Sequence, residues 1–240
     1  KLGEEVFNTL VAGGVKDKQA TSWASSIAGV FGKVKKDKPF EIEQLAHIST
    51  AEKQAVLALA DLLCNEQRAP TVDELKLLKA DRTSVDIALF GRMLASSPEF
   101  NVEAACQVAH SISVHKVLVE DDYFTAVDDL NDGKTDPGSA HIGEANFAAA
   151  LFYSYICINK SQLVENLGGN EALADSAIKA LTEAAVKVSP KGKQNSFASR
   201  AYASYVMAEM GEQQPRSLSV SYLKPVQDED VAEAAITAIE

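Results

Sequence analysis

Cysteine, proline and long apolar runs are all scarce in this sequence of 240 residues. The three cysteines, Cys64, Cys106 and Cys157, are far apart and odd in number, which argues against a zinc module or a disulfide framework. We expect them to be small core residues in the reducing cytoplasm. No run approaches the ~18 apolar residues of a membrane-spanning helix, and no signal-peptide pattern is found. We therefore expect a cytoplasmic protein without membrane contact.

Positive charge is scarce in one segment above all. Residues 117–148 carry eight acids and one lysine, whereas the whole chain has a net charge of −11. Because contacts with phosphates depend on lysine and arginine, an acidic chain is a poor general binder of nucleic acid. The local exception is KVSPKGKQNSFASR, residues 187–200, with four basic residues and no acid. Charge alone favours a solvated turn here, built on Pro190 and Gly192.

Helical patterns dominate the first hundred residues. Residues 49–52 (STAE) and 71–74 (TVDE) have the spacing of a capping box, which marks the start of a helix. The second helix is expected to be short, with Leu75 and Leu78 on one face. Another apolar helical stripe is formed by Trp23, Ile27 and Phe31.

The pattern changes to period two near residue 104. Residues 104–114 alternate and predict a long strand with one buried face, which would include His110 as a core histidine. The run FAAALFYSYICIN, residues 147–159, is apolar on both faces and is expected in the middle of a sheet. Further strands are predicted at 201–210 and 216–223.

Two helices complete the predicted order of elements. One follows Leu167–Asn170 (LGGN), which has the chemistry of a turn and a helix cap, and carries an apolar stripe from Leu173 to Val188; the other begins near Asp228. The order strand, strand, helix, strand, strand, helix predicts an α+β fold. It matches a ferredoxin-like unit, the RNA-recognition-motif (RRM) fold, that lacks its first strand and helix. The sequence starts at Lys1 and stops inside a helical pattern, so we expect a piece of a longer chain.

Residues 120–130, EDDYFTAVDDL, lie in a connection of about thirty residues between two predicted strands, far longer than a hairpin turn. Connections of this length are functional or disordered, and we interpret this one as a protruding arm. An alternative is a metal-dependent hydrolase that uses the acidic segment 120–144 with His141 and Glu144. Its arrangement is poor, because adjacent acids on a strand point to opposite faces. We expect no metal, no cofactor and no catalytic residue.

The segment SVDIALFGRML, residues 84–94, allows two interpretations. In the first, Met93 belongs to the core and Arg92 pairs with an acid such as Asp86. In the second, the segment borders a groove, Met93 wedges between bases and Arg92 reaches a phosphate or stacks. The sequence pattern leaves both open.

Five motifs together resemble a known family. In chain order they are SVDIALFGRM, AACQVAHSISVHKV, DDYFTAVDDL, GSAHIGEANFAAALFYSYICIN and LVENLGG. They are similar to the CasC family, the backbone subunit of the type I-E CRISPR Cascade complex. The resemblance implies an RRM-like palm, helical fingers and a long thumb hairpin. It also implies that copies polymerise along one CRISPR RNA with other Cascade subunits and displace bases without catalysis, while target DNA pairs with the guide.

Carried over by position, the resemblance predicts a fingers domain at 1–100 and a palm at 101–240, interrupted by a thumb at 115–148. The RNA-binding residues that it implies are Arg92, Met93, His115, Lys116, Phe124, Thr125, Val127, Ile142, Lys193, Gln194, Asn195 and Ser196. Members of that family begin with a strand and a basic helix, and we expect both to be missing from this sequence, which starts at Lys1.

The acids of the thumb have a separate expected role. A segment of this charge is repelled by phosphates, yet it can place apolar and hydroxyl groups against bases and dock on a neighbour's basic surface. We therefore expect the thumb acids to serve subunit contact and arm geometry. These residues are Asp121, Asp122, Asp128 and Asp129.

Overall fold

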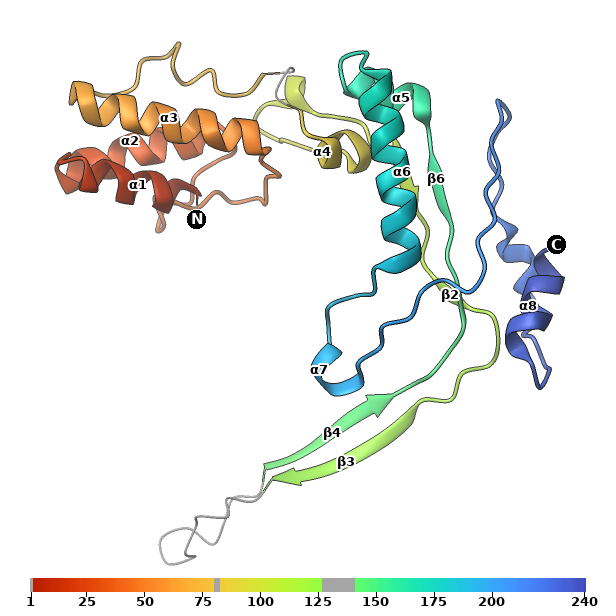
Figure 1. Ribbon diagram of the computed structural model, residues 1–240. Coiled ribbons are helices and arrows are strands. Elements are labelled where there is room, and N and C mark those ends of the chain that lie inside the picture. Colours follow the sequence, from red (N-terminus) through yellow and green to blue (C-terminus); the bar gives the residue numbers. More distant parts are fainter. Residues whose placement is uncertain (1, 80–82, 127–140) are drawn as a thin grey trace, which may run out of the picture. The chain divides into compact units, whose positions relative to one another are not determined.

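The computed structural model describes residues 2–79, 83–126 and 141–240 (Figure 1). The helices are α1 (Leu2–Ala12), α2 (Asp17–Gly29), α3 (Thr50–Glu66), α4 (Val85–Phe90), α5 (Lys160–Asn166), α6 (Glu171–Lys187), α7 (Gln194–Phe197) and α8 (Val231–Ile239), with 3-10 helices η2 (Pro98–Phe100) and η3 (Leu218–Tyr222). The strands are β1 (Cys106–Val108), β2 (Ile112–Ser113), β3 (Glu120–Ala126), β4 (His141–Phe147), β5 (Phe152–Tyr153) and β6 (Ile156–Ile158).

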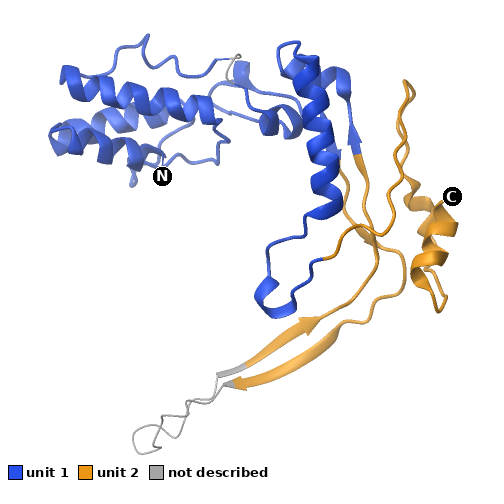
Figure 2. Cartoon of the chain, viewed as in Figure 1, with its two compact units in different colours: residues 1–107, 157–200 blue, residues 108–156, 201–240 orange. Residues whose placement is uncertain are grey.

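The chain forms two compact units that interleave along the sequence (Figure 2). Unit 1 comprises residues 1–107 and 157–200, and unit 2 comprises residues 108–156 and 201–240. Helices and small sheets together confirm the predicted α+β class. The predicted domains, 1–100 and 101–240 with a thumb at 115–148, remain predictions.

The core of unit 1 lies among α1, α2 and α3, which run side by side in Figure 1. Helix α3 begins with the predicted capping box: the Ser49 hydroxyl accepts from the Glu52 amide at 3.0 Å, and the Glu52 carboxylate accepts from the Ser49 amide at 2.8 Å. The predicted stripe is buried as well, since Trp23, Ile27 and Phe31 are at most 8% exposed.

The second predicted capping box does not start a helix. Thr71 and Glu74 make the expected reciprocal hydrogen bonds, but only a turn follows. The prediction of a helix here was wrong. Leu77 and Leu78 are both 5% exposed in the core. A helix with one apolar face would have buried Leu75 and Leu78, whereas the irregular segment buries Leu77 and Leu78 and leaves Leu75 partly buried.

The turn and cap before α6 are confirmed. Gly168 and Gly169 have φ of +66° and +88°, and the Asn170 side chain accepts from the Leu173 amide at 3.0 Å. The apolar stripe predicted from Leu173 to Val188 is not the buried face of α6. The buried residues of this helix are Ala174 and Ala177, and Val188 is 68% exposed.

The described strands form three separate two-stranded sheets, β1–β6, β2–β5 and β3–β4. The expected long strand at 104–114 is therefore broken into β1 and β2. Its predicted buried face is confirmed only at Cys106 and Val114, which are buried, whereas Val108 is 60% exposed and His110 is exposed. The run 147–159 is likewise not central in a sheet. A strand in a two-stranded sheet has only one neighbouring strand. The apolar residues of both segments therefore predicted a larger sheet than the one that forms.

Two further strand predictions were wrong and one helix prediction was right. Residues 201–210 have no strand, and residues 216–223 contain the 3-10 helix η3 instead. Strand propensity depends on a partner strand, which neither segment has in the described part of the chain. The predicted last helix is α8, which the Asp230 side chain caps by accepting from the Glu233 amide at 3.0 Å.

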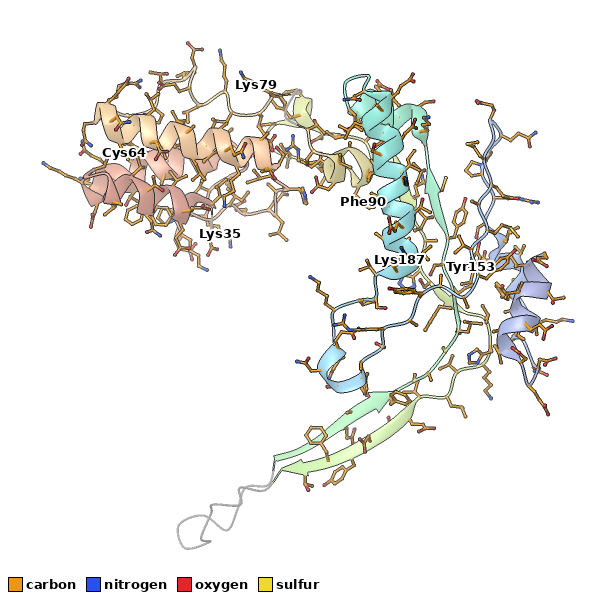
Figure 3. The ribbon with its side chains drawn as sticks, in the orientation of Figure 1. Lys35, Cys64, Lys79, Phe90, Tyr153 and Lys187 are labelled. Carbon is orange, nitrogen blue, oxygen red and sulfur yellow. The ribbon has the colours of Figure 1, made fainter. Side chains whose placement is uncertain are left out.

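Tyrosines hold the C-terminal part of unit 2 together. The rings of Tyr153, labelled in Figure 3, and Tyr222 have centroids 5.6 Å apart. The Tyr153 hydroxyl accepts from the Leu218 amide at 2.9 Å, and the Tyr222 hydroxyl donates to the Ala235 carbonyl at 2.8 Å. Burial raises the pKa of the Tyr222 hydroxyl.

Of the three cysteines expected in the core, one is fully buried. Cys106 is buried, Cys64 and Cys157 are partly buried, and all three thiols are free. Burial raises the pKa of both Cys64 and Cys106. Within the described residues, no helix has the length and apolar character needed to cross a bilayer.

Candidate functional site

The β3–β4 hairpin lies inside the segment predicted to be an arm. Its strands pair antiparallel from Glu120 opposite Phe147 to Ala126 opposite His141. Neighbours along a strand point to opposite faces, so the register divides the predicted RNA-binding residues. Phe124 is on one face and Thr125 is on the other.

Phe124 covers a glycine on its own hairpin. Gly143 is its cross-strand partner, and a Cβ atom at residue 143 would lie 2.5 Å from the tip of the phenyl ring. The aromatic ring therefore occupies the space that any larger residue would need. The ring is still 44% exposed, so it combines a structural contact with an open surface.

Tyr123 is a further candidate, which is absent from the RNA-binding residues implied by the sequence motifs. It is 61% exposed, shares a face with Thr125 and lies opposite Glu144. Tyr123 is two residues from Thr125, and residues with this spacing share a face of a strand. Knowledge of the strand would therefore have indicated Tyr123 as a candidate. Ile142 lies opposite Thr125 in the register.

The acids of the arm are distributed over both faces. The Asp121 carboxylate accepts a hydrogen bond from the Asn146 side chain, and Asp122 is exposed on the face of Phe124. Val127, Asp128 and Asp129 lie outside the described residues. Among the residues that are described, no three His, Cys, Asp or Glu side chains gather as a metal site would require.

Arg92 pairs with an acid, as the first interpretation predicted, but the acid is not Asp86. Its Nη1 donates to both carboxylate oxygens of Glu52, at 2.9 and 2.8 Å, and to the His47 carbonyl at 3.3 Å. The two side chains are 3% and 0% exposed. In this conformation the guanidinium is bound inside unit 1 instead of facing solvent.

Asp86 has other partners. Its carboxylate accepts from the Ser84 hydroxyl and lies 2.7 Å from His47 Nε2. The Ser84 hydrogen bond, followed by the one from His47, lowers the pKa of Asp86. Sequence proximity favoured Asp86 as the partner of Arg92, whereas only the folded chain brings Glu52 within reach.

Met93 is 73% exposed, so its interpretation as a core residue was wrong. It follows α4, whose last residue, Phe90, is labelled in Figure 3 and is 51% exposed. An exposed thioether is available for contact with a flat apolar surface such as a nucleobase. Of the second interpretation, the contact of Met93 with a base therefore stays a prediction, whereas Arg92 is bound to Glu52.

The basic loop is closed by one of its predicted RNA-binding residues. Gln194 Nε2 donates to the carbonyls of Pro190 and Ser199 at 2.6 and 3.1 Å. Lys193 has φ of +57° and is exposed, as are Asn195 and Ser196. Gln194 thus shapes the loop, and the other three residues face solvent.

His115 is also held by backbone groups. Its Nε2 accepts from the Leu151 amide at 3.1 Å, so Nδ1 carries the proton and donates to the Lys116 carbonyl at 2.9 Å. The ring is partly buried, whereas Lys116 is exposed. His115 thereby links the two segments that lead into the hairpin.

A family model described as CT1975-like protein (Cas_CT1975) matches residues 1–240. The chain belongs to the CT1975-like protein family. This confirms the recognition made from the five sequence motifs. No match was found among curated proteins.

Solved structures similar to this CT1975-like chain come from RNA-guided assemblies. A chain of a "CRISPR RNA-guided surveillance complex, pre-nicking" is 26% identical with a TM-score of 0.80, over 99% of this chain and 69% of that one. A chain of a "CRISPR RNA-guided surveillance complex" is 27% identical with a TM-score of 0.54, over 81% of this chain and 68% of that one. Both of these structural neighbours of the CT1975-like protein are thus chains of CRISPR RNA-guided surveillance complexes.

Proposed function

We propose that this chain is the non-catalytic, RNA-binding backbone subunit of a type I-E CRISPR surveillance complex in the cytoplasm. Copies polymerise along one CRISPR RNA beside other Cascade subunits, and the hairpin displaces bases so that target DNA can pair with the guide. The observation that carries the proposal is the likeness, over 99% of the chain, to a chain of an RNA-guided surveillance complex.

The hairpin has the chemistry for contact with bases. Tyr123, Phe124 and Thr125 offer exposed aromatic and hydroxyl groups on both faces. Stacking of a base on an aromatic side chain contributes about 1–3 kcal/mol and needs no particular base. The neighbouring acids keep the hairpin away from phosphates, so the hairpin inserts among bases instead of following the backbone. We add Tyr123 to the residues expected to contact RNA.

The basic loop supplies the complementary interaction. Lys193 is exposed in a stretch with four basic residues and no acid, and Gln194 holds the loop closed. Lysine neutralises phosphate and releases counterions irrespective of base sequence. This loop therefore faces the RNA backbone in the proposal, and Asp121 and Asp122 contact a neighbouring copy.

RNA binding by the full-length protein, assembled on a CRISPR RNA, tests the proposal. Lys193→Glu is expected to weaken binding for all sequences and to reduce the slope of log affinity against log salt by about 1. Lys18→Glu, the same charge change in α2, is the matched control and should leave the slope unchanged.

Phe124→Ala tests the hairpin separately. We expect the assembly to form, but the regular pattern of nuclease protection along the RNA to be lost. Equal protection by the wild type, Lys193→Glu and Phe124→Ala would contradict the site. Phosphodiesterase activity abolished by a chelator would instead support the metal-dependent hydrolase.

A further inference from the structure

Met93 is an exposed residue between two buried ones. Its side chain is 73% exposed, whereas Arg92 and Leu94 are 7% and 2% exposed. The residues on either side therefore anchor the backbone from which the methionine projects. An exposed methionine on a loosely held segment would lack such anchors.

The anchors are hydrogen-bonded as well as buried. Arg92 and Val102 exchange two backbone hydrogen bonds of 2.9 Å, and the Leu94 amide donates to the Asn101 side chain at 2.6 Å. Gly91, just before, has φ of +78°, and a Cβ atom there would lie 2.9 Å from the Val102 carbonyl oxygen. The backbone at Met93 is consequently restrained on both sides.

The Arg92 side chain extends this restraint to α3. It binds Glu52, whose carboxylate also accepts from the Ser49 amide in the cap of that helix. One carboxylate thus connects the start of α3 with the residue next to Met93. The link spans 40 residues of sequence.

Stability alone is a poor explanation for this pair. Desolvating two charges offsets much of their attraction, and well-packed apolar residues of similar volume are often equally stable. The pair is also incompletely satisfied, because Arg92 Nε is buried without a hydrogen-bond partner. What a directed ion pair adds over an apolar contact is a specific orientation of the two segments.

We infer that Arg92 and Glu52 are positioning residues that hold Met93 at a fixed place for contact with a nucleobase. The inference rests on the proposed function. Arg92 was expected to contact RNA directly. In this inference it acts indirectly, by positioning the exposed Met93. The inference also assigns Glu52, a residue of the helical region, to the RNA site.

The experiment uses the full-length protein assembled on a CRISPR RNA that carries 2-aminopurine at the displaced positions, because the fluorescence of this base rises when it leaves the stack. Met93→Ala should lose the rise. The double variant Arg92→Met, Glu52→Gln removes the ion pair but keeps a side-chain oxygen that accepts from the Ser49 amide, and it should also lose the rise while RNA affinity remains that of the wild type. Lys35→Ala, which breaks the exposed pair with Glu41, is the control and should keep the rise.

The outcomes separate the inference from the proposed function. A double variant with the fluorescence of the wild type overturns the positioning role, as does a Met93→Ala variant that keeps the rise, while RNA binding still stands. A wild type that binds no RNA overturns both. If the double variant does not fold, Glu52→Gln alone removes the charge of the pair and keeps an acceptor for the Ser49 amide, and unchanged fluorescence in that variant also overturns the role.

Discussion

The two units of this chain differ in how they are stabilised. Unit 1 has a core in which Val6, Leu10, Val56 and Leu63 are fully buried. In the described residues of unit 2, the buried apolar side chains are Val114 and Ala235 alone. Unit 2 also exposes many large apolar side chains, among them Val119, Tyr202, Val206, Met210 and Leu223.

The difference indicates different roles. Unit 1 can be held by apolar burial within itself, whereas two-stranded ribbons such as β3–β4 are marginally stable alone. Exposed apolar side chains in such number are typical of surfaces that contact a partner. The comparison agrees with the proposal of an assembly in which unit 2 contacts RNA and neighbouring copies through the hairpin, while Lys193 and Met93 of unit 1 also contact RNA.

Truncation of leucines gives the largest expected contrast. Leu63→Ala should lower the free energy of unfolding by about 2–5 kcal/mol, because it leaves a cavity in the core of unit 1. Leu223→Ala in unit 2, where the side chain is 82% exposed, should change it by less than about 0.5 kcal/mol. Urea denaturation of the two variants measures both values, and equal losses would break the comparison.

Glycine substitution tests the crowding of the two units. Gly91→Ala should destabilise by about 1–3 kcal/mol, because it imposes both an unfavourable φ and a clash with the Val102 carbonyl. At Gly211 in unit 2 an added Cβ meets no atom within 4 Å and φ is not in the left-handed region. Gly211→Ala is therefore expected to be neutral or slightly stabilising, and a destabilised Gly211→Ala variant in thermal unfolding would show hidden packing there.

Helix caps give a smaller contrast. Ser49→Ala removes a buried cap of the 17-residue α3 and should cost about 0.5–2 kcal/mol. Ser217 accepts from the Ser219 amide at the start of the short η3 in unit 2, and Ser217→Ala should cost less. The comparison is made by chemical denaturation, and a larger loss at Ser217 would contradict it.

Two surface ion pairs give the smallest effects. Hydrogen bonds from Arg68 lower the pKa of Glu74 in unit 1 to about 2, and Arg216 lowers the pKa of Glu209 in unit 2. Since the folded-state pKa is the lower one, Glu74 adds stability above the pKa of an unfolded glutamate and loses this contribution as pH falls toward 2. NMR titration should show the pKa of Glu74 rising in Arg68→Ala and that of Glu209 rising in Arg216→Ala. An unchanged glutamate pKa in either variant would show that the corresponding ion pair does not form in solution.

Local patterns predicted several helices of unit 1, although not the absence of a helix after Thr71, and they predicted the strands of unit 2 poorly. The capping box at Ser49, the stripe through Trp23 and the glycine turn before Asn170 are interactions between residues close in sequence, and the structure contains them. Apolar alternation at 104–114 and 201–210 predicted strands, but a strand also needs a partner at the right distance. No local pattern specifies that partner.

The candidate site shows the same division. Sequence motifs and local charge predicted as sites the segment around Met93, the arm and the basic loop. It did not identify Glu52 as the partner of Arg92, because the two residues are 40 positions apart, and it could not separate Phe124 from Thr125 by face until β3 was paired with β4.

By itself the sequence determined the family, the helix caps and the separation of acidic and basic segments, because these depend on residue type and short spacing. The tertiary structure alone decided which alternating segments became strands, which carboxylate bound Arg92 and that Met93 is exposed. These outcomes depend on contacts between residues distant along the chain, whose energies no local pattern contains.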